Sequence, residues 1–408
     1  MTNLLWPGDP RAGEHMTDRT LLGSMVAVES AWLGALAGAG LAPGQCADAD
    51  LSCLLARDDA ATVAAAAEDG GNPVIPLVQL LRGRADPAIA PWIHRGLTSQ
   101  DVLDSGLMLA VSSVVADLTS QLRQQISKLI KLATLHRATP MVARTLTQHA
   151  APTTFGAKVA GWLNGVLDAT ERLTALVIPI QIGGAAGTLA GAAELAALSD
   201  ALDPAAVAIE LVRSTASTLG LAVRSPWHTT RTPVTAVADA LVGCTDCWGR
   251  IASDVVTLAR PEIGELREPA GEGRGGSSSM PHKQNPVLSI LIRRAAITAP
   301  ALAATMHTAA ALANDERPDG AWHAEWDTLR TLCRRTVVAG SQCGELLAGL
   351  AVNAERMAEN LGAADVFGEQ RAIADLAGKQ PAATYFGAAA NLIDESLQRA
   401  RQSLGQSA

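Results

Sequence analysis

The sequence predicts an all-α fold built from long helices, and three observations lead to that prediction. Apolar residues recur at helical spacing along most of the 408 residues, and 48% of the chain is hydrophobic. Only 3% of the residues are aromatic while alanine is very common, and such small side chains let helix backbones approach closely. No stretch shows the alternating pattern of a strand, and no internal repeat is visible. A chain of this length has room for two or three domains.

The helical segments can be justified in order along the chain. Residues 60–84 predict a helix, a Gly-Gly-Asn-Pro break and a second helix. Further helices are predicted from Asp101 to about Leu135, from about Thr154 to Ile178, after Thr232 with Pro233 at the first position, after Pro286 to about Asn314, and from about Trp322 to Leu361. Helices this long need neighbours to cover their apolar faces, so we expect an elongated bundle.

Charge and composition exclude several classes of protein. The net charge is −8 and the charged residues are scattered without a basic run, which argues against a nucleic-acid partner. The N-terminus lacks the basic start and apolar core of a signal peptide, so we expect a soluble, cytoplasmic protein. The apolar run from Ala295 contains Pro300 and His307, and we interpret it as a buried bundle helix and not as a membrane span.

Two of the six cysteines, Cys244 and Cys247, have the spacing of a zinc or redox pair. They lie in a helical pattern without a second Cys or His pair nearby. We therefore expect buried thiols at a helix interface and no metal site.

Polar residues gather in five breaks between the helices: residues 94–101, 143–156, 225–233, 271–286 and 314–326. Five of the eight histidines lie in these breaks: His94, His149, His228, His282 and His323. Any one of them could simply be a loop residue that satisfies a helix end. For the whole set we prefer a site assembled from several helix ends.

The break that reads "GGSSSMPHKQNP", residues 275–286, carries the most chemistry. Its glycines make the approach to Ser277 mobile, and successive backbone N–H groups before Met280 can stabilise an anion. Lys283 adds a positive charge and Asn285 a neutral donor. A Gly/Ser-rich stretch is usually a linker, but linkers seldom continue directly into such a polar run.

These residues resemble a known family. "GGSSSMPHKQNP" matches the Gly-Ser-Ser-x-Met-Pro-x-Lys-x-Asn signature of the fumarase/aspartase superfamily at every fixed position. "GLTSQDVLDSG" and "RTLTQHAAPTTFG" resemble the first and second active-site segments of that superfamily. Further segments, including "QIGGAAGTLA", "SPWHTTR" and "GAWHAEW", are similar to the corresponding segments of bacterial 3-carboxy-cis,cis-muconate cycloisomerases, one branch of that superfamily. The resemblance spans roughly residues 20–330 and fades after about 360.

The resemblance implies a mostly helical protomer of three domains that forms a homotetramer, with each active site built from three subunits and with no metal or organic cofactor. We expect an N-terminal domain over residues 1–96 and a central bundle over 97–345 that carries the catalytic loop at about 267–285. A small C-terminal domain over 346–408 is shortened relative to the family.

The resemblance also assigns the site residues. Proton transfer at carbon falls to Ser277, and Lys283 and His149 are the other catalytic candidates. The candidates for substrate binding are His94, Thr98, Ser99, Arg144, Gln148, Thr153, Ser278, Met280, Asn285 and His323. A serine is a poor base unless its alkoxide is stabilised, which the loop N–H groups and Lys283 can do.

The predicted reaction converts 3-carboxy-cis,cis-muconate, a small tricarboxylate, to 4-carboxymuconolactone in the β-ketoadipate route of aromatic catabolism. Fumarases and adenylosuccinate lyases carry a histidine where this chain has Leu146. In the reverse lactone reaction the leaving group is a carboxylate with a pKa near about 4, so it departs without a proton and needs no acid there. Two alternatives remain open: an adenylosuccinate-lyase-like β-elimination of another carboxylate, and a catalytically silent structural member of the family.

Overall fold

The computed structural model describes residues 3–269, 271, 273–280 and 282–405. Within that part of the chain there are thirteen α-helices and four short strands, which confirms the all-α prediction. The helices are α1 (Asp18–Gly38), α2 (Asp59–Gly70), α3 (Val74–Arg84), α4 (Ser99–Leu135), α5 (Phe155–Thr174), α6 (Ala190–Leu198), α7 (Pro204–Leu219), α8 (Thr232–Leu258), α9 (Val287–Ala311), α10 (Gly320–Ala348), α11 (Ala354–Ala363), α12 (Gly368–Ala377) and α13 (Ala389–Ser403).

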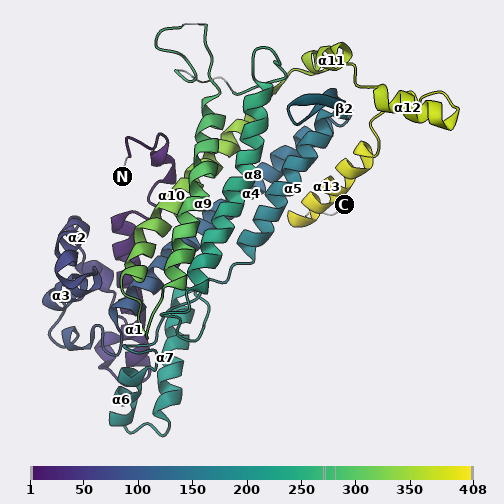
Figure 1. Cartoon of the computed structure of the whole chain (residues 1–408). Coiled ribbons are helices and arrows are strands. Elements are labelled where there is room, and N and C mark those ends of the chain that lie inside the picture. Colours follow the sequence, from purple (N-terminus) through teal and green to yellow (C-terminus); the bar gives the residue numbers. More distant parts are fainter. Residues whose placement is uncertain (1–2, 270, 272, 281, 406–408) are drawn as a thin grey trace.

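Five long helices, α4, α5, α8, α9 and α10, form the central bundle (Figure 1). α8 packs along α9, α9 along α10, and α4 along α5. α4 has 37 residues, so at 1.5 Å of rise per residue it is roughly 55 Å long. The bundle therefore separates its two ends by a distance that no side chain can bridge.

The two ends of the bundle carry different segments (Figure 1). Helices α1, α2 and α3, together with α6 and α7, lie at the end where α4 begins. The short helices η1 (Asp9–Ala12), η2 (Gly44–Cys46), η3 (Leu51–Leu54) and η4 (Ala90–Trp92) complete the N-terminal part. The hairpin of β1 (Pro140–Thr145) and β2 (Gln148–Thr154), the pair of β3 (Leu266–Arg267) and β4 (Ala351–Val352), and α11 lie at the opposite end.

The start of α4 shows how the sequence sets this arrangement. Thr98 and Asp101 form a reciprocal capping box, which satisfies free N–H groups of the first turn. The following residues bury a continuous apolar face that includes Val102 and Val111. Large aromatic side chains such as Trp248 are fully buried against such faces, so the few aromatics of this chain fill its core.

Two secondary-structure predictions differ from the structure. The second polar break, expected as a loop, is an antiparallel hairpin over residues 140–154. The helix expected to run to Leu361 ends at Ala348, because Ala351 and Val352 pair with β3 before α11 begins. Pairing between strands decides where the hairpin forms and where the helix ends, and helical periodicity in the sequence does not reveal such pairing.

Helix α9 is less buried than the sequence predicts. α1, α4 and α9 are long and apolar enough to cross a membrane by length and composition alone. In α1 and α4, 61% of the apolar window is buried within the chain, but in α9 only 33% is. Ile290 and Ile297, seven residues apart on one face of α9, are 48% and 72% exposed. The expectation of a buried helix is therefore wrong for the single chain, which leaves an apolar face of α9 open.

The cysteine pair lies within α8, and Cys244 is buried there while Cys247 is partly buried. Burial raises the pKa of the Cys244 thiol to about 12. Among the described residues, no group of three or more His, Cys, Asp or Glu side chains is arranged to hold a metal ion.

Candidate active site

Ser277 lies in a turn of the Gly/Ser loop, and its hydroxyl oxygen faces backbone donors of the same loop. The N–H of Met280 donates to Ser277 Oγ at 3.2 Å and that of Ser279 at 3.4 Å. Two N–H dipoles aimed at one oxygen favour negative charge on it. The geometry therefore suits a serine that loses its proton. Ser278, Met280 and Lys283 are exposed beside it.

The base of the loop is closed by polar contacts. Asn285 donates to the carbonyl of Gly275 from its backbone N–H at 2.8 Å and from its side-chain amide at 3.1 Å. Gly275 has φ +77, and a Cβ there would lie 2.8 Å from the Asn285 carbonyl, so glycine is required. Asn285 was predicted to bind substrate, and in this structure its amide holds the loop together.

A second set of contacts anchors the loop to α10 and to the N-terminal segment. Glu345 on α10 forms ion pairs of 2.6 Å with both Arg274 of the loop and Arg11 of η1. Burial acts to raise the pKa of Glu345, but the hydrogen bonds and charges of the two arginines outweigh it and lower that pKa. Glu345 therefore acts as a charged tether for the arm that leads to Ser277.

The β1–β2 hairpin presents the second segment. Leu146 and Thr147 form its two-residue turn with φ values of 47° and 71°, a conformation that normally favours Asn and Gly. Leu146 is 95% exposed, and Gln148 and His149 follow it on the exposed part of β2. Backbone strain of this kind tends to occur at functional sites.

Arg144 faces inward from the same hairpin. Its guanidinium pairs with the fully buried carboxylate of Glu265 at 2.7 and 3.1 Å, and the amide of Asn360 on α11 donates to the same carboxylate. This arrangement ties the hairpin to α11, so the predicted substrate-binding arginine is engaged within the chain. Thr153 pairs across the hairpin with Met141.

The first segment is organised by Asp101, which is fully buried. Its carboxylate accepts hydrogen bonds from the backbone N–H groups of Thr98, Gly183 and Gly184 at 2.9 to 3.0 Å. Nε2 of His228 lies 3.1 Å away from the same carboxylate. Asp101 therefore holds the start of α4, the Gly-Gly turn and the "SPWHTTR" segment in one place. Ser99 is the first residue of α4 and is half-buried, and Thr98 Oγ1 also accepts from Arg317.

A buried cluster of three charges lies beside Asp101. Arg231 pairs with Asp104 at 2.6 Å and with Glu325 at 2.5 Å, and all three side chains are nearly inaccessible. Burial alone would lower the pKa of Arg231, but the two carboxylates outweigh it and raise that pKa. Burial raises the pKa of Glu325, although Arg231 opposes this. One arginine thus neutralises only one of two buried carboxylates.

Two predicted histidines lie at this end of the bundle. His94 Nδ1 is 2.6 Å from Glu29 Oε1 of α1. The two ring nitrogens of His323 lie 3.0 Å from the Asp319 carbonyl and 2.9 Å from the Gly71 carbonyl. Both histidines therefore lie where the N-terminal helices meet the bundle, His94 against α1 and His323 against the residue that follows α2.

The structure does not bring all the predicted site residues together in one chain. The first segment precedes α4, and the second follows it, so roughly 55 Å of helix separates them. The "SPWHTTR" segment precedes α8, whose 27 residues span roughly 40 Å before the chain continues into the Gly/Ser loop. The first segment thus lies at one end, and the hairpin and loop lie at the other.

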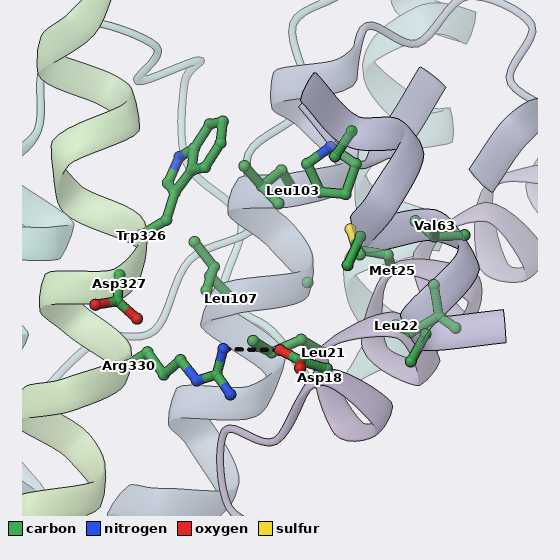
Figure 2. Close-up of a pocket in the computed structure, with 15 residues that line it drawn as sticks. Asp18, Leu21, Leu22, Met25, Val63, Leu103, Leu107, Trp326, Asp327 and Arg330 are labelled. Carbon is green, nitrogen blue, oxygen red and sulfur yellow. Dashed lines mark hydrogen bonds and ion pairs between the residues drawn. The ribbon is translucent and has the colours of Figure 1, made fainter. Parts of the chain in front are cut away.

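Two cavities bear on the site. A groove of about 1180 Å³ runs between the Gly/Ser loop and the β3–β4 pair, and His282, Gln284 and Asn285 line it. An apolar pocket of about 270 Å³ lies among α1, α2, α4 and α10, with the Arg330–Asp18 ion pair at its edge (Figure 2). Of the predicted site residues, Asn285 lines the loop groove and none lines the apolar pocket, so we place the chemistry at the loop groove.

The sequence did not single out several residues that organise the site. Asp101 could have been found, because it stands three residues after a capping threonine. Glu29, Asp104 and Glu325 carry no local signal, since only the packing of distant helices brings them to His94 and Arg231.

The chain is similar to known proteins over most of its length. The family described as Lyase matches residues 48–300. A nitrosuccinate lyase of Streptomyces davaonensis is 44% identical over 354 residues, which cover 85% of this chain and 73% of that protein. A 3-carboxy-cis,cis-muconate cycloisomerase of Pseudomonas aeruginosa is 40% identical over 355 residues, covering 85% of this chain and 74% of that protein.

Solved structures are similar over almost the whole chain. The 3-carboxy-cis,cis-muconate lactonizing enzyme of Pseudomonas putida superposes with a TM-score of 0.79 at 31% identity, covering 97% of this chain and 87% of that one. A fumarate lyase of a Mesorhizobium species superposes with a TM-score of 0.78 at 27% identity, covering 96% and 86%.

Proposed function

The chain belongs to the fumarase/aspartase superfamily of lyases, and on that premise we propose that it makes or breaks a bond beside a substrate carboxylate, with Ser277 moving the proton. The observation that carries the proposal is the pair of backbone N–H groups, from Ser279 and Met280, directed at Ser277 Oγ. A proton α to a carboxylate is only weakly acidic, so the base must be strong and its alkoxide must be stabilised.

Lys283 completes this charge arrangement. Its side chain is exposed in the loop three residues after Met280, between His282 and Gln284, which line the groove between the loop and the β3–β4 pair. A cation there stabilises both a serine alkoxide and the extra charge that develops on the substrate carboxylate as the α-proton leaves. Asn285 keeps the loop closed around this arrangement.

We propose 3-carboxy-cis,cis-muconate as the substrate. One of its carboxylates attacks its own double bond, a C–O bond forms, and Ser277 delivers a proton to the carbon that receives the electron pair. In reverse, the Ser277 alkoxide removes that proton and the C–O bond breaks to release a carboxylate. Leu146, at the tip of the hairpin, supplies no acid, and a carboxylate needs none.

Nitrosuccinate is a second candidate, favoured by the 44% identity to a nitrosuccinate lyase. Ser277 would remove a proton from the CH2 group, which is α to the carboxylate farther from the nitro group, and the C–N bond of the neighbouring carbon would break to release nitrite and give an unsaturated dicarboxylate. Nitrite, like a carboxylate, is a weakly basic anion that leaves without a proton. The absence of an acid at Leu146 therefore suits both substrates and disfavours the loss of hydroxide or an amine.

We further propose that the active site is shared between copies of this chain in a homotetramer. The first segment and the Gly/Ser loop lie at opposite ends of the bundle, so only another copy can bring them together. The open apolar face of α9, with Ile290 and Ile297, is suited to cover the same face of a neighbouring copy.

The test is a turnover assay with the purified wild type and Ser277→Ala. Loss of the conjugated diene reports carboxymuconate turnover, nitrite release reports nitrosuccinate turnover, and adenylosuccinate serves as the substrate with a basic leaving group. We expect turnover of a substrate with a weakly basic leaving group and none of adenylosuccinate.

Ser277→Ala should lower kcat by about 10²- to 10⁴-fold, as expected for loss of a general base, and leave the melting temperature unchanged. Ser279→Ala, which keeps its backbone N–H and changes the one serine that the signature leaves free, is the matched control. Ser277→Ala activity within about tenfold of wild type would remove Ser277 from the proton-transfer role.

A further inference from the structure

His94, the first polar residue of the first segment, has an unusual backbone. Its φ is +63, in the left-handed region that few residues other than glycine adopt. Two side chains from other helices hold the backbone on either side of it. Arg82 of α3 donates to the carbonyl of the preceding residue at 2.7 Å, and Trp32 of α1 donates to the carbonyl of the following residue at 2.7 Å. The strained conformation is therefore maintained by specific contacts.

A third side chain, Glu29 of α1, holds the ring. Its Oε1 lies 2.6 Å from Nδ1 of His94, and Glu29 is 1% exposed. Its other oxygen, Oε2, has no hydrogen-bond partner among the described residues. A buried carboxylate costs several kcal/mol unless a donor or counter-charge meets it. The His94 ring supplies that partner, so the proton on Nδ1 is directed to Glu29.

This contact decides which nitrogen of His94 is left for a ligand. The His94 side chain retains 18% exposure, and Nε2 makes no hydrogen bond within the described part of the chain. A histidine whose Nδ1–H is held by a carboxylate has a fixed tautomer and ring orientation. Its Nε2 edge then points away from Glu29, towards the accessible side of the first segment.

We propose that Glu29 is a positioning residue that fixes the Nδ1–H tautomer of His94 and presents Nε2 to a substrate carboxylate. This inference rests on the function proposed above, because it places the carboxylate of that substrate at the first segment. When a substrate carboxylate binds at Nε2, that nitrogen takes up a proton from solvent and donates it to the carboxylate, while Nδ1–H still donates to Glu29. Glu29 thus acts on substrate binding through His94 and takes no part in proton transfer at carbon.

The experiment compares Glu29→Gln with wild type in the intact protein. Glutamine keeps the shape and an acceptor oxygen but removes the charge. We expect KM for the turned-over substrate to rise about tenfold, the effect of weakening one charged hydrogen bond. We expect kcat to stay within about threefold, because Glu29 acts on substrate binding through His94 and takes no part in proton transfer at carbon. Glu68→Gln, the same substitution at an exposed site of α2, should change neither constant.

A double-mutant cycle separates this role from general destabilisation. In a His94→Gln background, Glu29→Gln should raise KM by less than about twofold more, because its effect passes through the imidazole ring. An equal rise in KM in both backgrounds, or no rise in the wild-type background, would overturn the inference.

A spectroscopic measurement makes the inference testable even if no substrate is turned over. Nitrogen-15 NMR of histidine-labelled wild type, with His94 assigned by its loss in His94→Gln, should report the proton on Nδ1. An Nε2–H tautomer for His94 would refute the role of Glu29 whatever the substrate is. Failure of the proposed function would instead show as no turnover together with the expected tautomer.

Discussion

Leu146 is the residue on which the nature of the leaving group depends. To shape a pocket its side chain needs an apolar contact, but in the single chain it is 95% exposed at a left-handed turn. Any such contact must therefore come from another copy. In either case its side chain can neither donate nor accept a proton.

We predict that Leu146→His gives no gain in turnover of carboxymuconate. The leaving carboxylate needs no acid, so the rate should stay at or below that of wild type, with Leu146→Met, close in volume, within about twofold of it. The diene assay at neutral pH measures both variants. A severalfold increase for Leu146→His would mean that protonation of the leaving group matters, and would favour the β-eliminating lyases.

The buried carboxyl of Glu325 makes the stability of the folded protein depend on pH, and its pKa gives the direction of that dependence. Its pKa is raised above the ordinary 4.5, chiefly by burial. A carboxyl with a raised folded-state pKa favours folding only while protonated. Its contribution is therefore present below pH 4.5 and is lost as the pH rises through the raised pKa.

We predict that Glu325→Gln gains stability relative to wild type between pH 4.5 and pH 8. Glutamine cannot ionise, so the pH-dependent penalty disappears, while Arg231 keeps its pair with Asp104. Urea unfolding at both pH values and at one protein concentration gives the difference. If the stability difference between Glu325→Gln and wild type did not change with pH, or changed in the opposite direction, the raised pKa of Glu325 would be contradicted.

At the scale of elements, the Gly/Ser loop is rich in glycine but is anchored at its base. Glu268 caps the start of α9 by accepting from the N–H groups of Leu288 and Ser289. Glu345 holds Arg274 from the side of α10. These contacts therefore fix both ends of the loop that carries Ser277.

We predict that Glu345→Gln loosens this loop. Partly exposed ion pairs contribute roughly 0.2–1 kcal/mol each, so hydrogen exchange of residues 273–280 should accelerate by about two- to fivefold. We expect kcat/KM to fall by a similar factor, because Ser277 is placed less often. Glu262→Gln, an exposed glutamate beyond the end of α8, is the control. Unchanged exchange would show that Arg274 does not restrain the loop.

At the scale of the whole molecule, the length of the bundle governs where a site can form. α4 places the first and second segments roughly 55 Å apart, and no movement of side chains closes that distance. The hairpin tip with Leu146, Gln148 and His149 is exposed. The hairpin lies at the end of the bundle opposite to α1, α2 and α3 (Figure 1). The shared site that we propose would account for both features.

We predict that two inactive variants restore activity when they are mixed and reassembled. With Ser277→Ala and His149→Ala in equal amounts, a site that takes these residues from two different chains is intact in about a quarter of cases. About a quarter of wild-type activity is therefore expected. A chain that stays monomeric by light scattering at micromolar concentration, or a mixture without activity, would contradict the shared site.

The helical fold and the family were predictable because they depend on local signals, whereas the chemistry of the loop stays a prediction. Helical periodicity located α4, α8 and α9 to within a few residues at most ends. The sequence did not predict the hairpin, because its strands are short and its two-residue turn contains no glycine. The domain boundaries and the binding roles of residues such as Thr153 and His323 stay predictions.

The sequence by itself determined the helical class, the family and the serine loop, because periodicity and a contiguous motif are written in neighbouring residues. Only the tertiary structure decided which distant side chains meet: Glu29 with His94, Asp101 with His228, and Glu345 with Arg274. It also decided that the first segment and the loop lie at opposite ends of one chain. The physical reason is that such pairings depend on how segments 65 to 127 residues apart in the chain pack against each other. A buried charge meets its partner only once that packing exists.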